Sequence, residues 1–397
     1  MDKEEKLPKR DIVLLPLLSL LTIGILIGCA ELMAHRLYTE SAPFLAVCTG
    51  PVDPITGARA FPNSVCSDKS FETERVEYRF NSCGHRAGME CGQKAPGAYR
   101  IVIAGSSVTM GHSVQQDKTY ASLLPANIFR LTGRSVEVYN EGMITVHPHV
   151  AALRADELLA AKPDVILWTI SPFDIQVELP NPTFANPPQG TGLLATAWFK
   201  FKDALQSHSL SDAAAGLSQR MLKKFDESSL GTLLLHTMYE SQSVYVKSYL
   251  SSGDQAGFLQ TEPSADWQTR LRYFDGDVAT LAQKAKAAGV PLVVVLIPHG
   301  VQAAMISTGT WPAGYDPYKL DNELRTIVLS HGGIYIDILP DYRTIPNPER
   351  GYFLVDAHPN VLGHATISKL LAKEITAGVI PALAAPAQSQ AGLEQKK

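Results

Sequence analysis

Short apolar runs alternate with amphipathic segments along two stretches of the chain. Five runs are typical of strands buried on both faces, and they span residues 99–105, 135–142, 163–171, 291–298 and 334–340. Five segments with helical periodicity follow them, at residues 117–133, 147–162, 275–290, 316–333 and 360–379. The alternation predicts an α/β fold, a doubly wound parallel sheet of about five strands within a domain at 98–380.

The alternation is interrupted after Asp174, where residues 179–265 read as long helical stretches behind a proline-rich segment. We interpret them as a helical insertion that packs on its own core. The cluster of Trp198, Phe199 and Phe201 leaves open a surface that faces a membrane or covers a substrate. Residues 381–397 are rich in Ala, Pro and Gln and are expected to form a disordered tail.

The N-terminal region carries an apolar stretch of membrane-spanning length at residues 11–33. Lys3, Lys6, Lys9 and Arg10 precede it, so the positive-inside rule predicts a cytoplasmic segment at 1–10 and an extracytoplasmic domain. We expect an uncleaved single-pass anchor in the cytoplasmic (inner) membrane. The alternative is a lipoprotein signal, because Cys29 ends the sequence LIGC. Either alternative puts the domain in the periplasm or outside the cell.

The remaining cysteines all lie in residues 34–97, a segment rich in Pro and Gly that reads as a loop-rich neck. Their even number in an exported chain predicts disulfides. We favour the two pairs that close short loops, Cys48–Cys66 and Cys83–Cys91. A zinc site is the rival, but its usual C-x-x-C spacing does not occur.

Composition and charge narrow the possible partners. The net charge is −4, so no basic surface for nucleic acid is expected. The sequence GSSVTMG at 105–111 lacks the lysine of a phosphate-binding loop, and no metal or other cofactor is predicted. The apolar share of 45% allows a sizeable core, which favours a folded enzyme or binding protein.

Residues that follow the strands are the candidates for chemistry, because active sites of open α/β sheets lie at the carboxyl ends of strands. Ser107 follows the first strand, and Asp356 and His358 precede the last helix. Two residues apart in an extended chain, Asp356 and His358 would point the same way. A serine needs a base, and the base needs an orienting carboxylate, so these three residues could form a Ser-His-Asp triad.

These residues give the chain a resemblance to the SGNH (GDSL-like) hydrolase family. GSSVTMG at 105–111 resembles its first block, with Ser107 as nucleophile, and VYNEG at 138–142 resembles its second. PDVILWTISPFD at 163–174 resembles the approach to the third block, and DAHPNVLGH at 356–364 the fifth. The resemblance implies that Asp356 and His358 complete the triad. It also implies that the backbone N–H groups of Ser107 and Gly142 bind the oxyanion.

The chain departs from the family pattern in the third block. Phe173 stands where an asparagine should donate to the oxyanion, and loss of one donor typically costs about 10²–10³ in rate. His147, His149 and His299 are candidate replacements, although each is more simply an ordinary loop histidine. Asp174 is either a helix cap or a support for the oxyanion loop, and Asn140 and Thr109 are expected to shape the site through local hydrogen bonds.

Two alternatives remain for the serines: Ser107 as a helix cap, and Ser106 as the nucleophile. Three functions follow, in order of preference. The first is an extracytoplasmic serine esterase acting on acetyl or similar esters of a glycan. The second is an O-acetyltransferase for a polysaccharide, served by an acyl-donor partner in the membrane. The D-x-H spacing resembles that of alginate-type O-acetyltransferases. The third is a non-catalytic glycan-binding or assembly factor.

Overall fold

The computed structural model describes the chain except for residues 1–8, 38–44, 52–56, 93, 178–227 and 385–397. A five-stranded parallel sheet in the order β4-β3-β5-β6-β7 forms its centre. The strands are β3 (Tyr99–Ala104), β4 (Val136–Asn140), β5 (Val165–Ile170), β6 (Leu292–Leu296) and β7 (Ile334–Ile336). Every residue of β5 and β6 is buried, so the sheet is covered on both faces, as the apolar runs predict.

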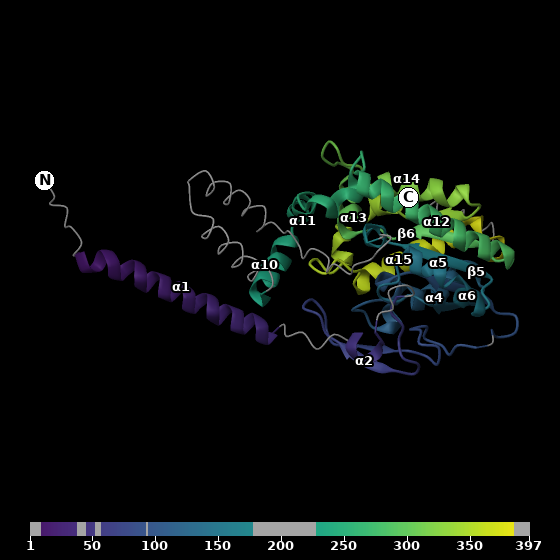
Figure 1. The fold of residues 1–397 in the computed structure, drawn as a ribbon, viewed down its shortest axis with the longest axis horizontal. Helices are drawn as coiled ribbons and strands as arrows, with labels where there is room; N and C mark the ends of the chain where they lie inside the picture. Colours follow the sequence, from purple (N-terminus) through teal and green to yellow (C-terminus); the bar gives the residue numbers. More distant parts are fainter. Residues whose placement is uncertain (1–8, 38–44, 52–56, 93, 178–227, 385–397) are drawn as a thin grey trace.

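Helices pack in two groups around the sheet (Figure 1). One group pairs α4 with α15, and in the other α12 contacts α5, α6, α7 and α14. The helices of the domain are α3 (Ser107–Met110), α4 (Tyr120–Thr132), α5 (Pro148–Leu153), α6 (Ala155–Ala160), α7 (Pro172–Gln176), α12 (Ala265–Ala287), α13 (Gly300–Thr308), α14 (Lys319–Ser330) and α15 (Val361–Glu374). Short helical turns are η1 (Gln116–Lys118), η3 (Pro340–Thr344), η4 (Pro348–Gly351), η5 (Ile375–Val379) and η6 (Pro381–Leu383).

The predicted helices differ from the observed ones at three places. The segment at 147–162 forms two helices that meet at the buried Arg154, whose guanidinium donates to the carbonyl of Ala58 at 2.7 Å. Helix α12 starts ten residues before the predicted start, where Ser264 caps it. Helix α13 was not predicted, because seven of its nine residues are buried and it shows no apolar stripe.

The N-terminal helix α1 (Lys9–Leu37) projects away from the domain (Figure 1). Its segment Val13–Arg36 is long and apolar enough to cross a membrane, with a mean hydropathy of 2.5, and its most apolar window is not buried inside the protein, although Ala34 near its end is. The predicted span is therefore present as one helix. A signal sequence near the N-terminus meets the same criteria of length and composition.

The predicted neck is part of the domain's own packing, which corrects the interpretation of a separate spacer. It contains α2 (Leu45–Cys48) and a hairpin of β1 (Val65–Asp68) and β2 (Val76–Arg79). Tyr78 and Phe80 are buried in the same core as the sheet. Disulfides Cys48–Cys66 and Cys83–Cys91 are both formed, as predicted, and Cys29 is free and exposed.

The described part of the predicted insertion is helical and comprises α10 (Ser229–Tyr239), α11 (Gln242–Leu250) and η2 (Gly253–Leu259). We expected this part to have a core of its own. Instead, Tyr245, Phe258 and Leu259 pack into the core of the domain. The cluster of Trp198, Phe199 and Phe201 lies outside the described residues. Of the predicted tail, Leu383 is buried in the domain, and residues 385–397 are not described.

Candidate active site

Ser107 lies at the mouth of the sheet, as the first residue of α3 directly after β3. Its Oγ is 2.7 Å from Nε2 of His358. Ser106 occupies the N-cap position and makes no capping hydrogen bond through its side chain. Ser107 is therefore not the helix cap, and its hydroxyl is the one that faces an imidazole.

Asp356 lies on the other side of the imidazole, and its Oδ1 is 2.6 Å from Nδ1 of His358. We expected Asp356 and His358 to converge through an extended chain. They do not, because Ala357 between them has a φ of +71°. A tight turn brings them together instead. The backbone N–H of His358 donates to Asp356 Oδ1 at 3.2 Å, and that of Ala357 donates to Phe353 at 2.7 Å.

The charges of this pair stabilise each other. Burial opposes ionisation of Asp356, but the positive charge and hydrogen bond of His358 outweigh it and hold the pKa of Asp356 well below its usual value. Burial likewise opposes protonation of His358, yet Asp356, and to a smaller extent Asp174, raise its pKa above 6.5. The pair thus combines an ionised carboxylate with an imidazole whose pKa lies above its usual value.

Activity that depends on neutral His358 is expected to fall as the pH drops through the raised pKa of His358. The acid limb of kcat/KM for an ester substrate should therefore have a midpoint above pH 6.5, with a plateau at higher pH. A pH-stat assay between pH 5 and 9 measures this limb. In Asp356→Asn the midpoint should move to lower pH, and a wild-type midpoint below 6 would contradict this assignment of the base.

Close backbone packing explains the two glycines of the first and second blocks. A Cβ on Gly105 would lie 2.0 Å from Thr109 Oγ1, and one on Gly142 would lie 2.5 Å from the backbone N of Met110. Asn140 stabilises the approach of the Gly142 loop to α3, since its Nδ2 donates to the carbonyl of Thr109 at 2.8 Å. Asn140 and Thr109 thus shape the site through local hydrogen bonds.

The oxyanion donors differ from the expectation at Gly142. Its backbone N–H already donates to Asn140 Oδ1 at 2.8 Å, so in this conformation the predicted donor is engaged within the protein. The N–H of Ser107 lies in the first turn of α3, where backbone N–H groups have no intrahelical acceptor. Ser107 is therefore the better of the two predicted donors.

The third block forms a helix start rather than an oxyanion donor. The side chain of Asp174 accepts from the backbone N–H of Ser171 at 2.7 Å and from its hydroxyl at 2.9 Å, which completes a capping box. Of the two alternatives, Asp174 thus has the capping role, as the third residue of α7 whose side chain faces the N-cap residue Ser171. Burial raises the pKa of Asp174, against the hydrogen bonds from the backbone and hydroxyl of Ser171. Phe173, at the asparagine position, is 40% exposed.

The three histidines proposed as replacement donors lie in different places. His147 begins α5 with its ring buried, which lowers its pKa to about 4. His149 pairs with Asp277 at 3.0 Å. His299 caps α13 by accepting from the N–H of Val301 at 3.2 Å. Burial, and then the charge of the nearby His358, lower the pKa of His299 to about 3.

His112 is a neighbour of the site that the sequence analysis missed. Its ring centroid is 4.8 Å from that of His358, and burial followed by the charge of His358 lowers its pKa to about 4. Its position directly after Gly111, at the end of the first block, was the available signal. His112, Asp356 and His358 hold ligand atoms within 4.8 Å of one another, a spacing that suits a metal ion. Both nitrogens of His358 are already hydrogen-bonded, to Ser107 and Asp356, so a metal would compete with that arrangement.

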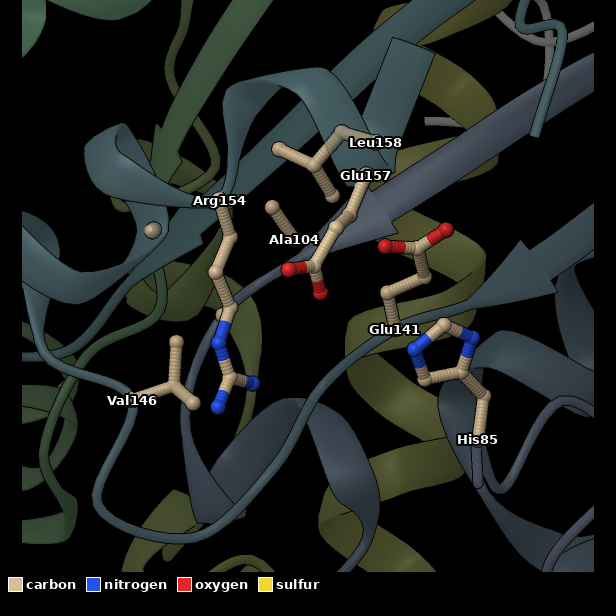
Figure 2. A pocket seen from close by; sticks show the side chains of 9 residues that line it. His85, Ala104, Glu141, Val146, Arg154, Glu157 and Leu158 are labelled. Carbon is tan, nitrogen blue, oxygen red and sulfur yellow. The ribbon is translucent and has the colours of Figure 1, made fainter. Parts of the chain in front are cut away.

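A small pocket next to the ends of β3 and β4 is lined by several titratable residues (Figure 2). Glu141, Glu157 and Arg154 direct their side chains into it, and the His85 ring lies beside Glu141. Glu141 is 8% exposed, and burial and the charge of Glu157 raise its pKa to about 8. Its carboxyl group therefore stays protonated at neutral pH.

Glu141→Gln is expected to stabilise the protein at alkaline pH. The unfolded chain ionises Glu141 near pH 4.5, whereas the folded chain holds the proton up to about pH 8, so wild-type stability falls between these values. The variant should melt at a temperature several degrees above wild type at pH 9, with a smaller difference at pH 5. The exposed Glu262→Gln is the control, and an equal shift at both pH values would contradict the burial of a protonated Glu141.

Comparison with known proteins finds similarity to this chain only among solved structures. No family model matches it, and neither does any curated protein. Solved structures that share similarity include TesA (10% identity, TM-score 0.36) and a lipase/acylhydrolase from Enterococcus faecalis (13%, 0.36). A third is the psychrotrophic esterase EstA from Pseudoalteromonas sp., inhibited by monoethylphosphonate (11%, 0.33). Each match covers 70% of this chain and 98%, 95% and 96% of the other chains, respectively.

The four segments that resemble SGNH blocks lie at successive strand ends of the sheet and before its last long helix. The first block follows β3, the second closes β4, the third follows β5, and Asp356 and His358 precede α15. Since the sheet is parallel, these strand ends meet at one edge, where the fold brings Ser107, Asp356 and His358 within hydrogen-bond distance. The chain has the doubly wound α/β fold and the block order of the SGNH hydrolases that its sequence resembles.

Proposed function

We propose that the chain is a membrane-anchored serine esterase that hydrolyses acyl esters, with acetyl esters of an extracytoplasmic glycan as its substrate. One observation carries the proposal. Ser107 Oγ is 2.7 Å from His358 Nε2, and His358 Nδ1 is 2.6 Å from the ionised Asp356. This geometry provides a nucleophile, a base and a group that orients the base.

The reaction then runs through an acyl-enzyme. Neutral His358 takes the proton of Ser107 as Oγ attacks the ester carbon, and Asp356 stabilises the imidazolium that forms. The protonated His358 gives the proton to the departing alkoxide. A water molecule, deprotonated by His358, then attacks the acyl-enzyme. His358 returns this proton to the departing Oγ of Ser107, which releases the acid and restores the neutral imidazole and the serine hydroxyl. The N–H of Ser107 supports the oxyanion in both steps.

The compartment in this proposal is the periplasm or the outer side of the cytoplasmic membrane. Basic residues precede the apolar helix α1, which favours a cytoplasmic N-terminus. Two disulfides in the domain favour an oxidising environment. An acetylated glycan of that compartment would be within reach of a domain that α1 holds at the membrane.

A second candidate function is O-acetyl transfer to a polysaccharide hydroxyl, with an acyl-donor partner in the membrane. The observation that favours it is the Asp356-x-His358 spacing, which resembles that of alginate-type O-acetyltransferases. Water and sugar would compete for the same acyl-enzyme. A non-catalytic glycan-binding factor is the third candidate, and the hydrogen-bonded order of Ser107, His358 and Asp356 weighs against it.

The test uses the full chain purified in detergent. We expect it to release p-nitrophenol from p-nitrophenyl acetate and acetate from an acetylated oligosaccharide, each at a rate above a catalyst-free blank. Adding an unacetylated oligosaccharide measures transfer by mass spectrometry. Acetylated product in place of acetate would favour the transferase, and no turnover of either ester would contradict an esterase.

A further inference from the structure

The turn that carries Asp356 is held by a carboxylate far away in the sequence. Glu72, in the loop between β1 and β2, accepts from the backbone N–H of Asp356 at 2.9 Å. Its two oxygens also lie 3.2 and 3.1 Å from the backbone N of Val355. The Glu72 side chain is 3% exposed, whereas Asp356 is exposed, so only the Glu72 side of these bonds is shielded from bulk water.

The turn needs such support because its backbone is strained. Ala357 has a φ of +71°, in the left-handed region, where the Cβ of a non-glycine residue lies too close to the following carbonyl oxygen. Conformations of this kind persist where surrounding contacts hold them. Glu72 binds the two backbone N–H groups immediately before Ala357. Hydrogen bonds at this position hold the turn so that Asp356 points toward His358.

Glu72 is itself held by the helix next to the membrane anchor. His236 of α10 lies with its Nδ1 2.7 Å from Glu72 Oε1, and this hydrogen bond raises the pKa of His236. Helix α10 packs against α1 (Figure 1). Glu31 of α1 accepts from the backbone N–H groups of Ser229 and Leu230, at 3.1 and 2.8 Å, in the first turn of α10.

We propose that Glu72 is a positioning residue of the reaction, which holds Asp356 in line with His358 and is in turn held by His236 of the helix docked on the membrane anchor. The inference rests on the proposed function of Ser107, His358 and Asp356. It adds a residue that touches no substrate and acts through the backbone of the turn. A physical connection thereby runs from α1 through α10 and Glu72 to the acid of the triad.

The test compares Glu72→Gln with wild type in the full chain in detergent, on p-nitrophenyl acetate. The amide keeps the shape but presents an N–H₂ group to donors, so the turn should loosen. We expect kcat to fall about 10- to 100-fold with KM within about twofold, since small misplacements of catalytic groups have such effects. The acid limb of kcat/KM should also move to lower pH, because His358 loses part of the effect of Asp356. A purely structural role would not move that limb.

Glu74→Gln is the matched control, with the same change of charge two residues away on an exposed side chain. It should leave kcat and the acid limb unchanged. If Glu72→Gln does not fold, as judged by thermal melting, His236→Gln decides the question. A shift of the acid limb to lower pH in that variant supports the proposal, and an unchanged limb overturns it.

A second readout separates this inference from the proposed function. Phosphonylation by a fluorophosphonate measures the reactivity of Ser107 without any natural substrate, and it should be slower in Glu72→Gln than in wild type. If wild type is active and Glu72→Gln is equally active and equally phosphonylated, the role of Glu72 is overturned and the proposed function stands. Wild type that neither turns over esters nor is phosphonylated at Ser107 overturns both proposals.

Discussion

Ser107→Ala is expected to lower kcat/KM for p-nitrophenyl acetate by at least about 10³-fold, since the acyl-enzyme can no longer form. Asp356→Asn should cost roughly 10³–10⁴, because the amide would favour the wrong tautomer of His358. The hydrogen bonds of 2.7 and 2.6 Å that join the three side chains are the physical basis of both effects. Initial rates in the presence of detergent measure them.

Non-additivity provides the stronger form of this test. If the three groups act as a unit, Ser107→Ala combined with His358→Ala should be no slower than Ser107→Ala alone. Ser106→Ala is the matched control, because Ser106 lies beside Asp174 and its hydroxyl is buried. It should keep most of the activity. Full activity in Ser107→Ala, or its loss in Ser106→Ala alone, would remove Ser107 from its proposed role.

Arg86→Met is expected to reduce the free energy of unfolding by about 2–4 kcal/mol, because several buried carbonyl groups lose a charged donor. The Arg86 guanidinium donates to the carbonyls of Gly111 and Val114 at 2.6 and 2.7 Å, and to that of Met110 at 3.1 Å. It also lies 4.3 Å from the centre of the Tyr78 ring, and the residue is 1% exposed. This contact joins the disulfide-bonded segment to the loop after Ser107.

Thermal or urea unfolding of the full chain in detergent measures the effect of Arg86→Met, and the melting temperature should fall by at least about 5 °C. Arg79→Met is the control with the same chemical change, since the Arg79 side chain is 67% exposed and its ion pair with Glu77 is on the surface. Its expected effect is under about 0.5 kcal/mol. A loss below 1 kcal/mol in Arg86→Met would contradict a structural role for this arginine.

Local sequence signals predicted most of the sheet and the position of the candidate nucleophile. The runs at Val165–Ile170 and Leu292–Leu296 are apolar throughout, because both faces of those strands are covered. Ser107 follows the first strand of the sheet, so its place at the carboxyl edge follows from the direction of the strand. Both disulfide pairs were also predicted, since each closes a short loop of 18 or 8 residues.

Other features could not be predicted because they depend on which groups have partners in the folded chain. The N–H of Gly142 looked like an oxyanion donor, yet Asn140 already accepts from it. The segment that we interpreted as a neck contains Arg86, and three of the carbonyl groups to which it donates lie 24 to 28 residues further along the chain. Helix α13 has no apolar stripe because it is buried on almost every side.

The sequence by itself determined the α/β fold, the apolar N-terminal helix, the disulfide pairs and the identity of Ser107, Asp356 and His358 as candidates. These depend on periodicity, on strand direction and on the types of residue at strand ends, which are local properties. Only the tertiary structure decided that Asp356 and His358 meet in a strained turn, and that Glu72, 284 residues before Asp356, holds that turn. The reason is that a buried carboxylate takes its partners from whatever donors the fold brings to it, and their spacing in the sequence carries no record of that contact.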